Sequence, residues 1–217
     1  MKKITLLFVC LLAGTVVFAQ KDPKAESILE KVSQTTQSFQ TIQSDFSYKM
    51  DNQSADIHED NKGTIILKKD KYKLGISTLG LEIFCDGKTV WTYMKDAEEV
   101  NIAGNDDDAS QMTNPSKIFT LYKHGFDYKY VGDSVQNGTP VFKIDLIPNS
   151  SSSIDYKHIL VSIDKNKHLI KKAVMYGKDG NIYTIEVTNL KTNVDAPDSL
   201  FVFDPATHPG VHQNDLR

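Results

Sequence analysis

The fold is decided by Gly63–Tyr93, GTIILKKDKYKLGISTLGLEIFCDGKTVWTY, a stretch in which apolar and polar residues alternate. Ile65 and Leu67 fall on one face of a first segment, and every second residue of Tyr72–Ile76 is apolar in the next. A period of two is typical of a strand with one buried face. Asp86-Gly87, a dipeptide that type I′ turns favour, then joins two further segments. The stretch therefore predicts a meander of antiparallel strands with an apolar, aromatic inner face.

The N-terminus has the features of a secretory signal peptide. Lysines precede the apolar run Ile4–Phe18, and Val17-Phe18-Ala19 offers a cleavage site after Ala19. The run is short for a membrane-spanning helix, which needs about 20 residues, so an uncleaved anchor is the less favoured alternative. Cys10 lies inside the run and follows Val9 rather than a small residue, which argues against lipid attachment there. We expect residues 1–19 to be removed.

Residues 20–217 are expected to form a single exported domain. They are enough for one hydrophobic core. The chain has a formal net charge of −3 and no basic stripe, so nucleic acid is not an expected partner. Cys85 is the one cysteine after the signal, which excludes an intramolecular disulfide and favours a small core residue.

Elsewhere the pattern predicts strands in hairpins with few helices. Asp22-Pro23 is a cap followed by proline, and it predicts a helix over about residues 24–37. About ten strands follow, joined by turns such as Asn137-Gly138, and His208–Arg217 has the composition of a loose tail. The fold class is therefore mainly β with a few helices (α+β). One antiparallel sheet of this size must curl, because strand twist accumulates.

A second cap with proline, Asn114-Pro115, predicts a short apolar helix that ends at Gly125. Such an element inserted between strands could be an ordinary core helix or a movable cover, and the sequence alone favours neither. The acidic run Asp106–Asp108 precedes it, and its carboxylates lack the alternate spacing of a calcium loop. A solvated loop is the interpretation we prefer for this run.

Motifs for catalysis, metal binding or cofactor binding are not found in the sequence. His208 and His212 have the spacing of a helical zinc pair, but Pro209-Gly210 between them opposes a helix. Gly75–Gly80 is one residue too long for a nucleophile elbow and lies between strands. We therefore expect no enzyme activity, no metal and no cofactor.

Four segments resemble, in order, the motifs of one known family. Phe39–Phe46 is similar to an opening F-x-T-x-x-S/A-D-F, and Gly63–Lys69 resembles a strand that ends in a basic pair. Phe84–Tyr93 contains D-G-K-x-x-W-x-Y, and Phe201–Pro205 is similar to a closing F-x-F-x-P. Each motif is weak alone, but together they resemble the periplasmic outer-membrane lipoprotein carrier proteins, LolA.

The resemblance implies an unclosed β-barrel, or half-barrel, with a helical lid over an apolar cavity. It implies a periplasmic carrier that receives acylated lipoproteins from an inner-membrane ABC transporter and shuttles them to the outer membrane, where the acceptor is unknown. A monomer is expected. Lys69 stands where the family has an arginine that holds the lid shut, and Asp70 replaces the proline that follows it. Lysine lacks a planar donor fork, so a latch at Lys69 would differ from the family's.

Apolar side chains on the predicted strands and the second helix are the candidate binding residues. For the cavity they are Phe46, Tyr48, Ile65, Leu67, Tyr72, Leu74, Trp91, Tyr93, Phe142, Ile144 and Leu146, and for the lid Ile118, Phe119 and Tyr122. Ordinary core packing is the alternative for each of them. Alternative functions are a lipid-binding regulator on the same fold, like the periplasmic anti-sigma accessory proteins, a carrier of a glycolipid or fatty acid, and an enzyme with titratable groups deep in the cavity.

Overall fold

The fold was analysed in a computed structural model, which describes residues 22–105, 125–150 and 154–217. These residues form one sheet of twelve strands, one α-helix and short 3-10 turns. The elements are α1 (Pro23–Ser38), β1 (Ile42–Asn52), β2 (Ile57–Lys68), β3 (Lys71–Ile76), η1 (Ser77–Leu79), β4 (Leu81–Cys85), β5 (Thr89–Met94), β6 (Glu99–Gly104), β7 (Phe126–Gln136), β8 (Thr139–Pro148), β9 (Tyr156–Asp164), β10 (Ile170–Gly177), β11 (Ile182–Thr192), η3 (Asp198–Phe201), η4 (Pro205–Thr207) and β12 (His212–Asp215).

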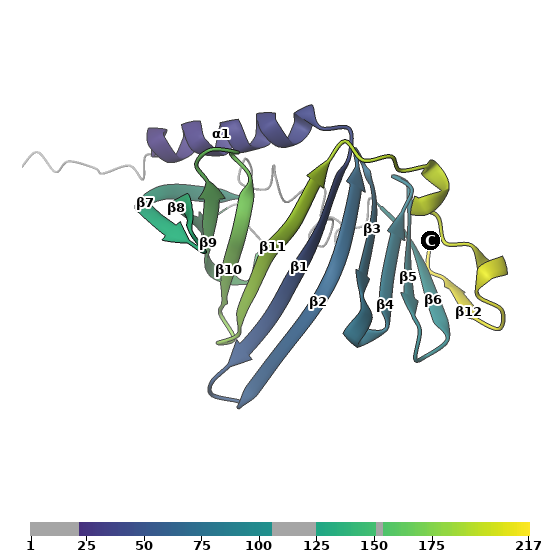
Figure 1. Cartoon of the computed structure of the whole chain (residues 1–217). Helices are drawn as coiled ribbons and strands as arrows, with labels where there is room; N and C mark the ends of the chain where they lie inside the picture. The colour runs from purple at the N-terminus through teal and green to yellow at the C-terminus, as the bar shows by residue number, and fades with distance from the viewer. Residues whose placement is uncertain (1–21, 106–124, 151–153) are drawn as a thin grey trace, which may run out of the picture.

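The sheet is curled and unclosed, as predicted. Its strand order is β12-β6-β5-β4-β3-β2-β1-β11-β10-β9-β8-β7, so β12 and β7 are the ends of the described sheet (Figure 1). Neighbouring strands are antiparallel except β12 and β6, which are parallel. The prediction of an antiparallel sheet throughout was therefore wrong at this edge. The predicted lid helix, residues 114–125, lies almost entirely outside the described residues.

Helix α1 begins where the sequence predicted. The Asp22 side chain accepts hydrogen bonds from the backbone N–H groups of Lys24 and Ala25 at 2.9 and 3.3 Å, and Pro23 occupies the first turn. The other Asp22 carboxylate oxygen accepts from the Tyr130 N–H at 2.9 Å, which ties the start of the helix to β7. This backbone bond is the main cause of the lowered pKa of Asp22. One carboxylate therefore caps the helix and fixes it on the sheet.

The two faces of the sheet follow from the strand register. We call the face on which α1 packs the inner face, and the opposite one the outer face. Under α1 the inner face is a closed core: Ile28 and Val32 of the helix cluster with Ile144, Val161 and other residues of β7–β10. These positions are bounded by α1 on one side and β-strand backbone on the other, as in a helix packed on a sheet. Figure 1 shows α1 lying across this end of the sheet.

The C-terminal segment covers part of the outer face. Phe203 is 3% exposed and packs its ring on Phe84 and Tyr93, with centroids 5.8 and 5.5 Å away. His208 packs on both Phe203 and Tyr93. Beyond it β12 pairs with β6, so the prediction of a loose tail over residues 208–217 was wrong.

The turn between β4 and β5 also differs from the prediction. Gly87 has a φ of 98°, but Asp86 is not in the left-handed region, so this is not a type I′ turn. Instead the Asp86 carboxylate accepts hydrogen bonds from the N–H groups of Lys88 and Thr89, both at 2.8 Å. By contrast, Asn137 and Gly138 both have positive φ, and the predicted two-residue turn between β7 and β8 is confirmed.

Candidate functional site

Away from α1, the inner face continues as an apolar surface over β1–β5 and β11. Its centre consists of Ile65, Leu74 and Ile83, which lie side by side on β2, β3 and β4. All three side chains are half-buried, in contrast to the closed core under α1. Ile76, Leu81, Met94, Ile185 and Val187 are further half-buried apolar residues of this face. We call these eight residues the inner-face tract.

The inner-face tract has a buried apolar end. One register step along the strands, Leu67, Tyr72, Cys85 and Val90 lie side by side and are almost fully buried. The Cys85 thiol is 3.7 Å from the carbonyl oxygen of Asp70, and the N–H of Gly87 donates to the sulfur at 3.4 Å. Burial raises the pKa of Cys85, so the neutral thiol is favoured. The prediction of Cys85 as a small core residue is confirmed.

Close packing of a ring over a glycine shapes the middle of this surface. Phe46 of β1 pairs with Gly63 of β2, and the Phe46 ring lies across the glycine. A β-carbon on Gly63 would be 2.3 Å from the Phe46 ring and 2.6 Å from the Gly75 carbonyl oxygen. Glycine at this position therefore lets the ring settle on the neighbouring strand, where it is 8% exposed.

The opposite end of the inner face, near the β1–β2 turn, is more polar. Tyr48 and Asn61 face each other across β1 and β2, and Tyr183 of β11 stacks on Tyr48 with a centroid distance of 6.2 Å. Tyr156 at the start of β9 contacts the Tyr183 ring edge-on at 6.1 Å. Desolvation raises the pKa values of Tyr48 and Tyr156. From the centre of the inner-face tract toward this turn, the inner face thus changes from aliphatic to phenolic.

Nine of the eleven predicted cavity residues lie on the inner face. Six belong to β1–β3 and three to β8, namely Phe46, Tyr48, Ile65, Leu67, Tyr72 and Leu74, and Phe142, Ile144 and Leu146. The β8 residues form or adjoin the core under α1, so they belong to the packed part of the face. Trp91 and Tyr93 do not join the others: they pair with Phe84 and Glu82 on the outer face, under the C-terminal segment.

The predicted lid residues Ile118, Phe119 and Tyr122 lie outside the described residues, so their contacts with the predicted latch are not described. Lys69 itself is exposed in the β2–β3 turn, with a φ of 55°. Its neighbour Lys68 instead donates to the Ala196 carbonyl at 2.8 Å, and Lys68 and Lys71 pair with Asp198 at 2.9 and 2.7 Å. The basic residues of this turn therefore hold the C-terminal segment.

Several members of the surface were not predicted from the sequence. Ile83, Tyr156, Tyr183 and Ile185 were not among the predicted cavity residues, because the face on which each lies depends on strand register rather than on a local pattern. In the part of the chain that the structure describes, no group of three or more histidine, cysteine or acidic residues could hold a metal ion. No described helix is long and apolar enough to cross a membrane.

Comparison with known proteins identifies the family. Residues 37–204, most of the chain, match the family described as outer membrane lipoprotein carrier protein LolA. The chain belongs to the LolA family. The matched range begins at the end of α1 and ends just before η4, so it contains the whole inner-face tract of this LolA-family domain.

Solved structures support the same fold. An uncharacterized conserved protein from Thermus thermophilus is similar with a TM-score of 0.61 and 10% identity, over 88% of this chain and 99% of that one. A DUF1329 family protein from Desulfovibrio piger is similar with a TM-score of 0.50 and 11% identity, over 85% and 99%. Among curated sequences, an uncharacterized protein of Methanocaldococcus jannaschii is 29% identical over 125 residues, 57% of this chain. The match spans about a third (35%) of that relative's length.

Proposed function

We propose that this protein is a periplasmic carrier that binds the acyl chains of lipoproteins on its inner face and shuttles them from the inner to the outer membrane. The observation that carries the proposal is the inner-face tract, a group of half-buried apolar residues on β2–β5 and β11 whose centre is Ile65, Leu74 and Ile83. Membership of the LolA family supports the same ligand class.

A carrier is needed because the free energy cost of exposing an acyl chain to water is large. Exposing an acyl chain to water costs about 0.8 kcal/mol per CH₂, or roughly 10 kcal/mol for a myristoyl-sized chain. A multiply acylated protein therefore does not leave a membrane unassisted at a useful rate. A carrier must bury the acyl chain nearly as favourably as a membrane does, but not more favourably. Release depends on the difference between the free energy of burial in the carrier and that in the next membrane.

The remaining parts of the proposal follow the family. An inner-membrane ABC transporter would load the carrier, and an acceptor at the outer membrane, which the sequence does not identify, would unload it. Ile118, Phe119 and Tyr122 are proposed to cover the apolar surface when no cargo is bound, with Lys69 as the latch. We propose a monomer without catalytic activity, because a binding surface and a cover are sufficient for this task.

The proposal is tested by two adjacent substitutions on opposite faces of β2. Ile65 and Ile66 are both half-buried, but Ile65 lies on the inner face and Ile66 on the outer face. A synthetic diacylated lipopeptide is mixed with residues 20–217 of the wild type, the Ile65→Glu variant and the Ile66→Glu variant. Bound lipopeptide is counted by native mass spectrometry, and transfer is followed from donor to acceptor phosphatidylcholine vesicles.

We expect binding and transfer by the wild type and the Ile66→Glu variant, and loss of both in the Ile65→Glu variant, since a carboxylate would be buried against hydrocarbon. Circular dichroism confirms that both variants are folded. Equal loss in the two variants, or no binding by the wild type, would refute an acyl-chain site on the inner face.

A further inference from the structure

Three tyrosines gather at the polar end of the inner face, one each from β1, β9 and β11. Tyr48 and Tyr183 are nearly parallel, with an angle of 22° between their rings, and Tyr156 meets Tyr183 edge-on at 79°. The cluster brings together residues 48, 156 and 183, which are far apart in the chain. We call it the tyrosine cluster.

The hydroxyl groups of the cluster differ in what they contact. The Tyr183 hydroxyl accepts a hydrogen bond from the Asn181 side chain at 3.1 Å, so it is directed to the β10–β11 turn, at the rim of the sheet. Asn181 in turn accepts from Asn52 at 2.6 Å, which links this rim to the β1–β2 turn. Among the described residues, neither the Tyr48 nor the Tyr156 hydroxyl has a hydrogen-bond partner.

The Tyr48 and Tyr156 hydroxyls bond to no described group, so they are available to an acceptor on a ligand. Burial has already removed part of the water around Tyr48 and Tyr156, which is the first cause of their raised pKa values. A ligand acceptor would replace water at these hydroxyls and would form its hydrogen bond within a partly desolvated surface. Tyrosine suits a boundary position, because its ring packs on hydrocarbon while its hydroxyl bonds to a polar group.

The tyrosine cluster also lies where the inner face changes from apolar to polar residues. Along β2, the inner-face residues change from Leu67, which is buried, through Ile65 and Gly63 to Asn61 and Glu59 at the rim. An amphiphile that follows this gradient has its hydrocarbon against Ile65 and its polar end at the tyrosine cluster. The reverse orientation would place its polar end against buried apolar side chains.

From this arrangement, and resting on the proposed function, we infer that the tyrosine cluster binds the ester carbonyls at the polar end of an acylated ligand. The Tyr48 and Tyr156 hydroxyls donate to the carbonyl oxygens, and the acyl chains run along β2–β4 toward the Leu67 end. The ligand class is a diacylglyceryl group, whose two esters provide two acceptors for two free donors.

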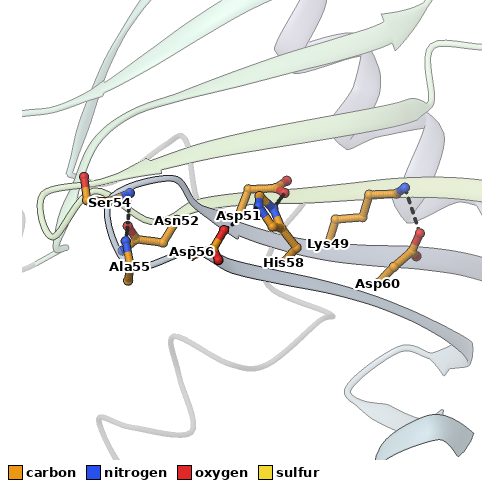
Figure 2. Close-up of polar contacts among 8 residues, drawn as sticks. All are labelled: Lys49, Asp51, Asn52, Ser54, Ala55, Asp56, His58 and Asp60. Carbon is orange, nitrogen blue, oxygen red and sulfur yellow. Dashed lines mark hydrogen bonds and ion pairs between the residues drawn. The ribbon is translucent and has the colours of Figure 1, made fainter.

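The β1–β2 hairpin is braced from its other side. On the outer face, Lys49 pairs with Asp60 at 2.8 Å, and the His58 ring is 2.9 Å from the Asp51 carboxylate (Figure 2). At the tip, the Asn52 side chain accepts from the N–H groups of Ser54 and Ala55, both at 3.1 Å (Figure 2). These contacts are exposed, so each is weak, but they lie along the strand pair that holds Tyr48.

The inference is tested with two lipids that differ only in the acceptor. Dimyristoylglycerol has ester carbonyls, whereas ditetradecylglycerol has ether oxygens and a comparable hydrocarbon. Affinity of residues 20–217 for each lipid is measured by displacement of a fluorescent acyl probe. The variants are Tyr48→Phe, Tyr156→Phe and the double variant, which keep the rings and remove the hydroxyls. The control is Tyr176→Phe, a half-buried tyrosine that stacks on His158 on the outer face.

We expect the wild type and the Tyr176→Phe variant to prefer the ester, and each cluster substitution to reduce that preference by about 2- to 10-fold, the value of one hydrogen bond. Affinity for the ether lipid should stay unchanged in all variants. A wild type that binds both lipids equally, or a double variant that keeps the full preference, would overturn the inference and leave the proposed function standing. Binding of neither lipid would overturn both.

Discussion

Replacement of Gly63 by alanine tests how the middle of the inner face is built. Gly63 pairs with Phe46 of β1 on one side and Ile76 of β3 on the other. Its φ is not positive, so alanine is compatible with the backbone conformation and the effect depends on space alone. The added methyl carbon would lie 2.3 and 2.8 Å from two atoms of the Phe46 ring and 2.6 Å from the Gly75 carbonyl oxygen.

The expected cost follows from which atoms can move. The Phe46 ring can rotate away, but the Gly75 oxygen belongs to the backbone of β3 and moves only with the strand. Overpacking of this kind costs about 1–3 kcal/mol. Alanine also restricts the unfolded chain, which offsets about 0.4–1 kcal/mol. We therefore expect the free energy of unfolding to fall by about 1–2 kcal/mol and the melting temperature by roughly 2–8 °C.

Gly75 provides a matched control, because it lies on the outer face of the adjacent strand. A β-carbon there would have the Thr64 hydroxyl at 3.7 Å as its nearest neighbour, an ordinary contact. The Gly75→Ala variant should therefore be as stable as the wild type or more stable by up to about 1 kcal/mol. Urea unfolding of both variants can be followed by the fluorescence of the single tryptophan.

A second substitution separates the two clashes. Phe46→Leu removes the ring but keeps the clash with the Gly75 carbonyl, so Gly63→Ala should cost less stability in the Phe46→Leu background than in the wild type, without becoming neutral. The reasoning would be refuted if Gly63→Ala and Gly75→Ala had the same stability. It would also be refuted if the Gly63→Ala variant unfolded at the urea concentration of the wild type.

Three further predictions concern the C-terminal segment and the buried thiol. Hydrogen bonds from Lys71 and Lys68 lower the pKa of Asp198 to about 2, so its contribution to stability is complete above the ordinary value of 3.8 and is lost as the pH falls toward 2. Urea titrations at several pH values should therefore show the wild type converging on the Asp198→Asn variant over this range, and a constant difference would argue against the pairing. Phe203→Ala should lower the free energy of unfolding by about 3–5 kcal/mol, because a buried ring is lost from the outer face; a loss below 1 kcal/mol in urea would contradict the packing. Cys85 should react with a thiol reagent only after unfolding, since it is 0% exposed and burial raises its pKa, and rapid labelling of the native protein would contradict that environment.

The sequence predicted those parts of the fold that depend on local signals. The cap at Asp22 and the proline after it located the start of α1, and Asn137-Gly138 located a two-residue turn. Alternation also recovered the inner-face residues of β2 and β3, such as Ile65 and Leu74, because Thr64, Lys68 and Lys73 lie on the opposite face. In each case the deciding interaction lies within a few residues of the signal.

Features that depend on distant partners were not predicted. The tyrosine cluster needs the register of three strands that are not consecutive in the chain, and no short pattern encodes it. The far end of the β1–β2 hairpin is another feature that depends on pairing. Residues 58–60 are polar and exposed, a composition typical of a loop, but they pair with β1 as a strand, and Asn61 beside them is 6% exposed.

Two predictions were wrong for one physical reason: the face assigned to Trp91 and Tyr93, and the loose tail assigned to the C-terminal residues. Trp91 and Tyr93 were assigned to the inner face because aromatic residues in a meander are expected to face its core. On β4 and β5 both faces are apolar, since Phe84, Trp91 and Tyr93 alternate with Ile83, Cys85 and Val90. On these two strands, alternation therefore does not distinguish the inner face from the outer face. The outer face can be apolar because the C-terminal segment, part of which was predicted to be a loose tail, covers it with Phe203 and Val211. A strand pair with two apolar faces therefore implies a second cover, and in this chain a polar, proline-containing C-terminus provides it.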